Sequence, residues 1–248
     1  MNVFRTDFEK TDVSLRGLAG FWLDVVFPPT CAHCGRIGWL LCPVCQTEMI
    51  RVPDAVCPRC GRMDDQPISA GTGVLCRQCR AHPPLLGQMR APLRYEEPTS
   101  TLIHRFKYEG YFALGRPLAR FLIDGWPAWD IPPDLILPIP LHPQRRRQRG
   151  YNQAELLARS LAEAINVPVN VSTLRRTRHT VPQVGLGPGE RHNNVWGAFA
   201  AEGSVVRDRH ILLIDDVLTT GATLSAAAET LLAAGAASVS GYCLARVS

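Results

Sequence analysis

The chain has 248 residues, of which 46% are hydrophobic, and its formal net charge at pH 7 is +5. That length suits one α/β domain with a small additional module. No stretch is apolar for long enough to span a membrane, and charged residues such as Asp7, Glu9 and Lys10 occupy the region where a secretion signal needs an apolar run. These features exclude the membrane-spanning and secreted classes, and we expect a cytoplasmic protein.

The first predicted element is a helix over residues 13–27. Apolar side chains recur there at helical spacing, and Pro28 and Pro29 end the pattern. We expect residues 1–27 to form an N-terminal helical segment that packs on another part of the protein. A helix that binds a partner is the alternative.

Residues 28–82 hold eight of the nine cysteines, arranged as four C-x-x-C pairs. The pairs are Cys31/Cys34, Cys42/Cys45, Cys57/Cys60 and Cys76/Cys79. The arrangement repeats, because the first pair of each half is followed by a glycine (Gly35, Gly61) that allows a tight turn around a metal. This predicts two sequential zinc ribbons with closed, structural Zn²⁺ sites, with interleaved pairing as the alternative.

Zinc binding changes the meaning of the net charge. Four thiolates on one Zn²⁺ carry a net −2, so two sites lower the chain to roughly +1. Overall basicity is then weak evidence for nucleic acid binding, which has to rest on local clusters.

Residues 85–248 alternate strand and helix patterns, which predicts a parallel sheet flanked by helices. The expected strands cover 88–95, 135–139, 167–171, 210–214 and 238–245. The expected helices cover 99–107, 113–124, 152–165 and 222–234. Asn152 should cap the third helix, with Glu155 in a capping box, and Gly235 should end the last one.

Two basic segments accompany these elements. Arg145, Arg147 and Arg149 lie in a loop after the 135–139 strand, where they suit pyrophosphate, a nucleic acid backbone, or plain solvation. A long loop over residues 176–200 should be mobile and could cover a phosphate site or form a binding surface. Its candidate residues are Arg178, Gln183, Arg191 and Asn194.

The most informative segment is Ile211–Leu224, I-L-L-I-D-D-V-L-T-T-G-A-T-L. A buried strand delivers Asp215 and Asp216 to its carboxyl end, and a small-residue loop then leads into a helix N-terminus suited to a phosphate. The acids suit ribose hydroxyls or Mg²⁺ and are the candidate catalytic residues, although an acidic pair can also merely cap a helix. The loop residues are Thr219, Thr220, Gly221, Ala222 and Thr223. The segment resembles the PRPP (5-phosphoribosyl 1-pyrophosphate) signature of type I phosphoribosyltransferases.

The combined motifs resemble the ComF family. They are the four C-x-x-C pairs, P-I-P-L-H-P-x-R-x-R-x-R-G-Y-N-Q-A, and I-D-D-V-x-T-T-G-A-T, and the likeness runs from about residue 27 onward. The resemblance implies an α/β protein of type I phosphoribosyltransferase fold with an N-terminal double zinc ribbon. It also implies a role in bringing internalised single-stranded DNA into natural transformation.

Three functions follow from these motifs. The first is a protein that binds PRPP and handles single-stranded DNA across the ribbons and the Arg145–Arg149 region, with a competence helicase or another DNA-processing protein as partner. The second is an active phosphoribosyltransferase that uses Mg²⁺, PRPP and an unknown acceptor. The third is a zinc-ribbon adaptor with a vestigial pocket.

Overall fold

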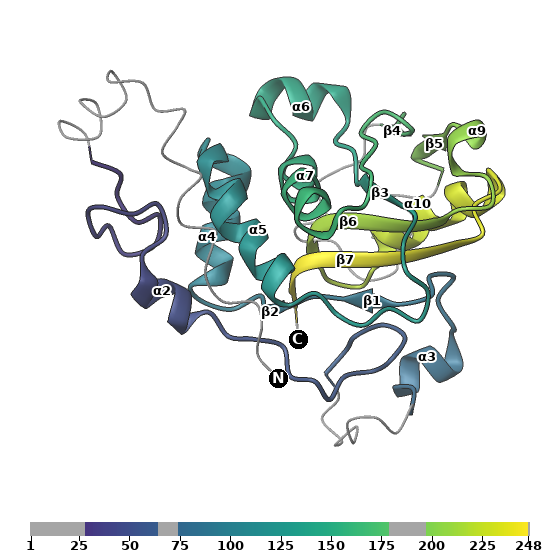
Figure 1. Ribbon diagram of the computed structural model, residues 1–248, viewed down its shortest axis with the longest axis horizontal. Coiled ribbons are helices and arrows are strands. Elements are labelled where there is room, and N and C mark those ends of the chain that lie inside the picture. The colour runs from purple at the N-terminus through teal and green to yellow at the C-terminus, as the bar shows by residue number, and fades with distance from the viewer. Residues whose placement is uncertain (1–27, 64–73, 179–196, 248) are drawn as a thin grey trace.

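The computed structural model describes residues 28–63, 74–178 and 197–247. At its centre is a five-stranded sheet in which every strand pair is parallel (Figure 1). The strand order is β1-β7-β6-β3, and β2 also pairs with β7. These strands are β1 (Met89–Arg90), β2 (Leu93–Arg94), β3 (Leu135–Pro138), β6 (His210–Leu218) and β7 (Ser238–Arg246).

Helices cover both faces of this sheet, which confirms the expected fold class. They are α4 (Thr99–Tyr108), the 3-10 turn η1 (Phe112–Leu114), α5 (Gly115–Asp124), α6 (Pro143–Arg149), α7 (Gln153–Ile165), α9 (Gly203–Val206) and α10 (Ala222–Ala233). Strand side chains alternate between two core layers. Leu212 and Ile214 pack in the layer of α4, α5 and α7, whereas Ile211 and Leu213 pack in the layer of α10. Among the described residues, no helix is long and apolar enough to cross a membrane.

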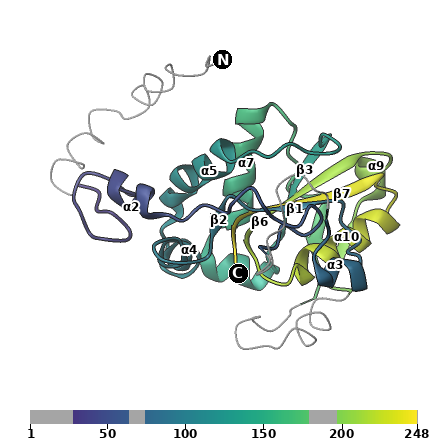
Figure 2. The ribbon, with the colours of Figure 1, turned by 90° about the horizontal axis from the view of Figure 1, so that it is seen from below.

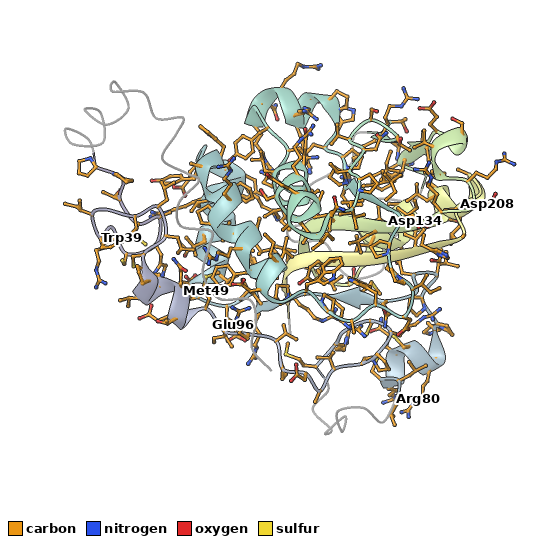
Figure 3. All side chains as sticks on the ribbon, in the orientation of Figure 1. Trp39, Met49, Arg80, Glu96, Asp134 and Asp208 are labelled. Carbon is orange, nitrogen blue, oxygen red and sulfur yellow. The ribbon has the colours of Figure 1, made fainter. Side chains whose placement is uncertain are left out.

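Each cysteine-rich half of residues 28–82 joins a different core layer. The first half, with helix α2 (Pro43–Glu48), places its buried cysteines in the layer of α4, α5 and α7. The second half, with α3 (Arg77–Ala81), places its cysteines in the layer of α10. Figure 3 shows Trp39 at the outer end of the first half and Met49 close to α4 and α5. Seen from below, α2 and α3 lie near opposite ends of the molecule (Figure 2).

Hydrogen bonds fasten the second half to the sheet. The Arg246 guanidinium donates to the Cys60 carbonyl at 2.6 Å, and the Arg90 guanidinium donates to the Pro58 carbonyl at 2.8 Å. The Met89 amide donates to the Arg59 carbonyl at 2.8 Å. The second cysteine cluster is therefore built onto the central strand β7 and its neighbour β1.

Two predicted strands are shorter than expected. The 88–95 segment divides into β1 and β2 around Pro92, whose ring nitrogen has no hydrogen to donate to a ladder. The carbonyl of Pro92 instead accepts from the Val52 amide at 2.9 Å. The expected 167–171 strand is reduced to a single parallel bridge between Val169 and Ile136.

The basic stretch after β3 is a helix, α6, so the prediction of a loop was wrong. Pro143 occupies the first turn, where a missing N–H costs nothing, and Gly150 ends the helix with a φ of +85°. Arginine is a good helix former, so local propensity supports this short helix once both ends are fixed.

The predicted N-cap of α7 is present, but the predicted capping box is not. The Asn152 side chain accepts from the Ala154 amide at 3.2 Å, as expected of an N-cap. Glu155 does not complete a capping box, because its carboxylate forms ion pairs with Arg146 at 3.0 Å and Arg159 at 2.9 Å.

A two-stranded antiparallel sheet flanks the predicted long loop. Strand β4 (Leu174–Arg176) pairs with β5 (Phe199–Ala201). The predicted helix at 13–27 and the loop residues Gln183, Arg191 and Asn194 lie outside the described residues.

Candidate functional site

Strand β6 runs through the acidic pair, beyond its predicted end at Ile214. Val217 and Leu218 still pair with Ala245 and Arg246 of β7. Because neighbouring strand residues face opposite sides of a sheet, Asp215 and Asp216 belong to different faces. Asp216 is buried with 8% exposure, and Asp215 is half-buried.

Lys107, at the end of α4, is the nearest charged partner of Asp216. Its Nζ lies 2.7 Å from the Asp216 Oδ1. Burial by itself lowers the pKa of Lys107, but the charge and hydrogen bond of Asp216 outweigh burial, and the net effect raises that pKa. The lysine is therefore held as a cation against the acid. Lys107 was not among the predicted site residues, because nothing in its local pattern connects it with a strand so far along the chain.

The R-G-Y-N-Q motif holds Lys107 in place through the main chain. The Tyr151 hydroxyl donates to the Phe106 carbonyl. The Gln153 amide donates to the same carbonyl at 3.3 Å and to the Lys107 carbonyl at 3.5 Å. Asn152 donates to the Ile139 carbonyl at 3.0 Å, which ties α7 to the exit of β3. These polar residues thus fix the end of α4 next to the acids.

Asp215 lies in a different electrostatic environment. Burial, followed by the negative charge of Asp216, raises the pKa of Asp215 to about 7, although Lys107 and Arg176 partly oppose this shift. Its Oδ1 accepts from the Asp216 amide at 2.9 Å. Arg176 of β4 was expected in the long loop but belongs to this acidic site.

The predicted phosphate loop follows β6 and opens α10. Gly221 has a φ of +80°, in the left-handed region that favours glycine, and directly precedes the helix. The Thr220 hydroxyl accepts from the Ala222 amide at 3.3 Å. A Cβ at Gly221 would approach the Met89 sulfur to 3.2 Å, so the loop packs closely on β1.

The arginines of α6 share the sheet edge of the acids, because α6 follows β3 and β3 pairs with β6. Arg147 is exposed and Arg149 is half-buried, with its Cζ 5.0 Å from the centre of the Tyr108 ring. Arg145 is half-buried, and Arg178 is exposed beyond β4. Figure 1 shows α6 and α3 on opposite sides of the central sheet, so the structure does not bring the arginines and the second ribbon together.

A separate depression of about 500 Å³ lies away from these residues. Its lining includes Trp126, Trp129, Pro133 and Ile165. These residues precede β3 or end α7, so the depression lies at the other edge of the sheet from Asp215 and takes no part in the acidic site.

The eight paired cysteines form two groups of four. The groups are Cys31, Cys34, Cys42 and Cys45, and Cys57, Cys60, Cys76 and Cys79, with all sulfurs of a group within 4.8 Å of one another. This confirms sequential rather than interleaved pairing. Cysteine sulfurs at about 2.3 Å from a tetrahedral Zn²⁺ are about 3.8 Å apart. The Cys34–Cys42 and Cys60–Cys76 sulfur distances are 3.6 and 3.7 Å, so each group fits one structural Zn²⁺.

Main-chain amides favour the thiolate at the first cysteine of each group. Burial raises the pKa of Cys31, but N–H groups of Cys42, Cys34 and His33 outweigh burial and lower it to about 6. The equivalent Cys57 has its pKa lowered to about 7 by the corresponding amides, again against burial. A thiolate is the form that binds zinc, so Cys31 and Cys57 favour the ligand state, whereas burial and then the neighbouring sulfurs raise the pKa of Cys45 and Cys79.

His33 lies between Cys31 and Cys34 and is half-buried. Its Nδ1 lies 3.3 Å from the Cys45 sulfur, and its Nε2 lies 3.5 Å from a Glu97 oxygen. His33 therefore links the first cysteine group to the segment that leads into α4.

Two family models match the chain. Residues 22–80 match the double zinc ribbon domain, and residues 149–248 match the phosphoribosyl transferase domain. Among solved structures, adenine phosphoribosyltransferase from Leishmania tarentolae aligns over 60% of this chain and 61% of its own, at 17% identity and a TM-score of 0.33, which is too low to add to this assignment.

Curated relatives match over most of their length. DNA utilization protein YhgH of Salmonella typhi is 32% identical over 84% of this chain and 91% of its own. Competence protein F of Haemophilus influenzae is 33% identical over 87% of this chain and 96% of its own. Competence protein ComFC of Bacillus subtilis is 32% identical over 83% of this chain and 84% of its own. With two four-cysteine clusters and a parallel sheet that ends in the acidic motif, the chain belongs to the ComF family, in which a double zinc ribbon precedes a phosphoribosyltransferase domain.

Proposed function

We propose that this protein binds PRPP at the edge of β6 and handles single-stranded DNA during natural transformation. The observation that carries the PRPP proposal is the acidic pair followed directly by a glycine-initiated helix, with Lys107 fixed beside Asp216 at 2.7 Å. Acids, a cation and a helix N-terminus gathered at the carboxyl end of parallel strands suit a phosphorylated sugar.

Each part of PRPP has a candidate partner. Backbone amides and hydroxyls of Thr219, Thr220, Gly221, Ala222 and Thr223 would hold the terminal phosphate. Asp215 and Asp216 would hold the ribose hydroxyls and a Mg²⁺, which prefers carboxylate oxygens. Since Lys107 already neutralises Asp216, an ion at that carboxylate would share it with the lysine.

The DNA proposal draws on the relatives, which are named for DNA utilization and competence. Arg145, Arg147 and Arg149 of α6 offer forked donors to phosphate groups, of pyrophosphate or of a DNA backbone. The predicted loop residues Arg178, Gln183, Arg191 and Asn194 would add to the phosphate site or to the binding surface. In this proposal the protein works in the cytoplasm on internalised strands, with a helicase or another DNA-processing protein as partner.

We also propose the division of the chain into residues 1–27, a double zinc ribbon at 28–82 and a phosphoribosyltransferase-like domain at 85–248. The hydrogen bonds from Arg246 and Arg90 to the second ribbon support a rigid attachment of the double zinc ribbon to the phosphoribosyltransferase-like domain.

Calorimetry with PRPP and Mg²⁺ tests the sugar-phosphate site. Wild type should bind, and Asp216→Asn should weaken binding by tenfold or more. Asp208→Asn is the matched control, because this exposed acid lies before β6, at the opposite edge of the sheet. Equal affinity in all three proteins, or no binding to wild type, would refute the site. Pyrophosphate release with a candidate acceptor would instead identify a working transferase.

Fluorescence anisotropy with labelled single-stranded DNA tests the second part. Affinity should fall steeply with salt, and Arg147→Gln should reduce the salt slope by about 1 if it contacts a phosphate. Arg209→Gln makes the same charge change at an exposed position before β6 and should leave the slope unchanged. Absence of binding at low salt would rule out the DNA proposal.

A further inference from the structure

Two large aromatic rings are exposed at the end of α4 and just after it. Tyr108, at the end of α4, is 59% exposed, and Phe112, in η1, is 65% exposed. Burying a ring of this size normally stabilises a fold, so two exposed rings so close in the chain indicate a binding surface.

The last residue of α6 and a residue just after it contact the two rings. The Arg149 Cζ lies 5.0 Å from the centre of the Tyr108 ring, and the Tyr151 ring lies 6.2 Å from the Phe112 ring in an edge-on contact. Gly150 alone separates Arg149 from Tyr151 in the chain and so links the two contacts, and we name Tyr108, Arg149, Tyr151 and Phe112 the aromatic strip.

Tyr151, in the middle of the strip, is held in place by the core. The Tyr151 hydroxyl donates to the Phe106 carbonyl, and its ring also packs on the buried Phe106 at 5.9 Å. Gly150 fixes the turn between Arg149 and Tyr151 in a left-handed conformation. A surface ordered before binding loses little freedom when a ligand stacks on it.

The charge around the strip suits an anion. Within the described part of the chain, Arg147 has no ion-pair partner and is exposed. Glu109, which follows Tyr108 in the chain, is offset by Arg105 at 3.6 Å, and its other carboxylate oxygen lies 3.3 Å from the His104 Nδ1. Flat rings next to unpaired arginine are the combination by which proteins bind single-stranded nucleic acid without sequence preference.

We infer that the aromatic strip stacks the bases of single-stranded DNA, while the arginines of α6 contact its phosphates. This inference rests on the proposed DNA-handling function and adds the residues that recognise the bases. Every base offers a flat face, so the strip should accept any sequence. Because Tyr108 follows Lys107, a strand on the strip would lie next to the proposed PRPP site.

The test compares a labelled oligothymidine with an abasic strand that carries the same number of phosphates. Wild type should bind the oligothymidine about tenfold more tightly, because stacking adds to the phosphate contacts. Tyr108→Leu and Phe112→Leu should each remove most of this preference while keeping the salt slope. Tyr108→Phe keeps the ring and should keep the preference. Ile131→Ala, which shortens an exposed apolar side chain before β3, serves as the control.

The outcomes separate this inference from the function on which it rests. If wild type binds neither strand, the DNA-handling proposal fails. If it binds both equally, or if Tyr108→Leu and Phe112→Leu keep the preference, the strip inference fails and DNA handling stands. Thermal melting and PRPP calorimetry on each variant should match wild type. Variants that lose both base preference and PRPP affinity at unchanged stability would also overturn the strip as a separate site.

Discussion

Lys107 and Asp216 meet at the sheet edge with 2.7 Å between Nζ and Oδ1, although one ends a helix and the other lies within the strand β6. The acid is buried, so the lysine compensates a charge that would otherwise be costly. This pair joins the α4 layer to the strand that bears the acidic motif.

Removing one member of this pair should destabilise the protein strongly. Lys107→Met leaves Asp216 buried without a partner, and we expect a loss of about 2–4 kcal/mol in the free energy of unfolding, slightly below the value for a fully buried pair. The double variant Lys107→Met/Asp216→Asn should recover part of this loss. Urea unfolding measures both. Arg159→Met breaks the exposed pair with Glu155 and should cost less than about 1 kcal/mol; equal losses at the two sites would contradict the interpretation.

The stability of the protein should depend on the protonation of Asp215. The pKa of Asp215 is raised from 3.8 to about 7, so the folded protein keeps a proton that the unfolded chain releases. The free energy of unfolding should therefore fall as pH rises from about 4 to about 7. Asp215→Asn removes this dependence. The free energy of unfolding of the variant minus that of wild type should therefore be larger at pH 8 than at pH 5, by at least about 1 kcal/mol. Denaturant unfolding at both pH values checks this, and parallel curves for the two proteins would disprove it.

Equivalent glycines in the two ribbons should respond differently to alanine. Gly35 and Gly61 both have positive φ, but a Cβ at Gly35 has no atom within 4 Å, whereas one at Gly61 would lie 2.4 Å from the Met89 carbonyl oxygen. Gly35→Ala should cost about 1 kcal/mol for its backbone conformation. Gly61→Ala should cost clearly more, because β1 must move. Thermal denaturation compares the two, and equal melting temperatures would show that the ribbon is not packed against β1.

The two ends of α10 provide a matched test of the phosphate loop. Gly221 and Gly235 flank this helix with φ of +80° and +97°. Alanine at either position strains the backbone, but only Gly221→Ala changes the loop that would hold the phosphate. We expect weaker PRPP binding by calorimetry for Gly221→Ala and wild-type affinity for Gly235→Ala. Weaker binding for Gly235→Ala alone would contradict the placement of the phosphate in the Gly221 loop.

Metal content should follow the cysteine groups. Wild type should hold two zinc ions per chain, and Cys57→Ala should hold one and unfold at a lower temperature. Cys243→Ala replaces a buried thiol outside both groups and should keep both ions. Elemental analysis of dialysed protein gives the stoichiometry. Chelator treatment should expose both core layers, since each ribbon packs in one of them.

Features that depend on the spacing of residues close in the chain were predictable from the sequence. The C-x-x-C repeat gave the two metal sites, and the apolar run with T-T-G-A-T gave the strand, loop and helix of the candidate site. Lys107 was missed because its partner is distant in the chain, and long-range contacts leave no local pattern. Helix α6 was predicted as a loop because prolines follow the preceding strand, although Pro143 only begins the helix. The end of β6 was misplaced because polar residues usually stop a buried strand, whereas here the ladder with β7 and the Lys107 ion pair keep the acids within it.

The position of β7 also governs the order in which the molecule can assemble during synthesis. Strands β1 and β2, at residues 89–94, pair with β7, at residues 238–246. The Cys60 carbonyl accepts its hydrogen bond from Arg246 of the same strand. The second ribbon and the early strands therefore leave the ribosome long before the strand that unites them. Such distant pairing favours slow folding. In the nascent chain, zinc would be the first agent able to order the N-terminal region.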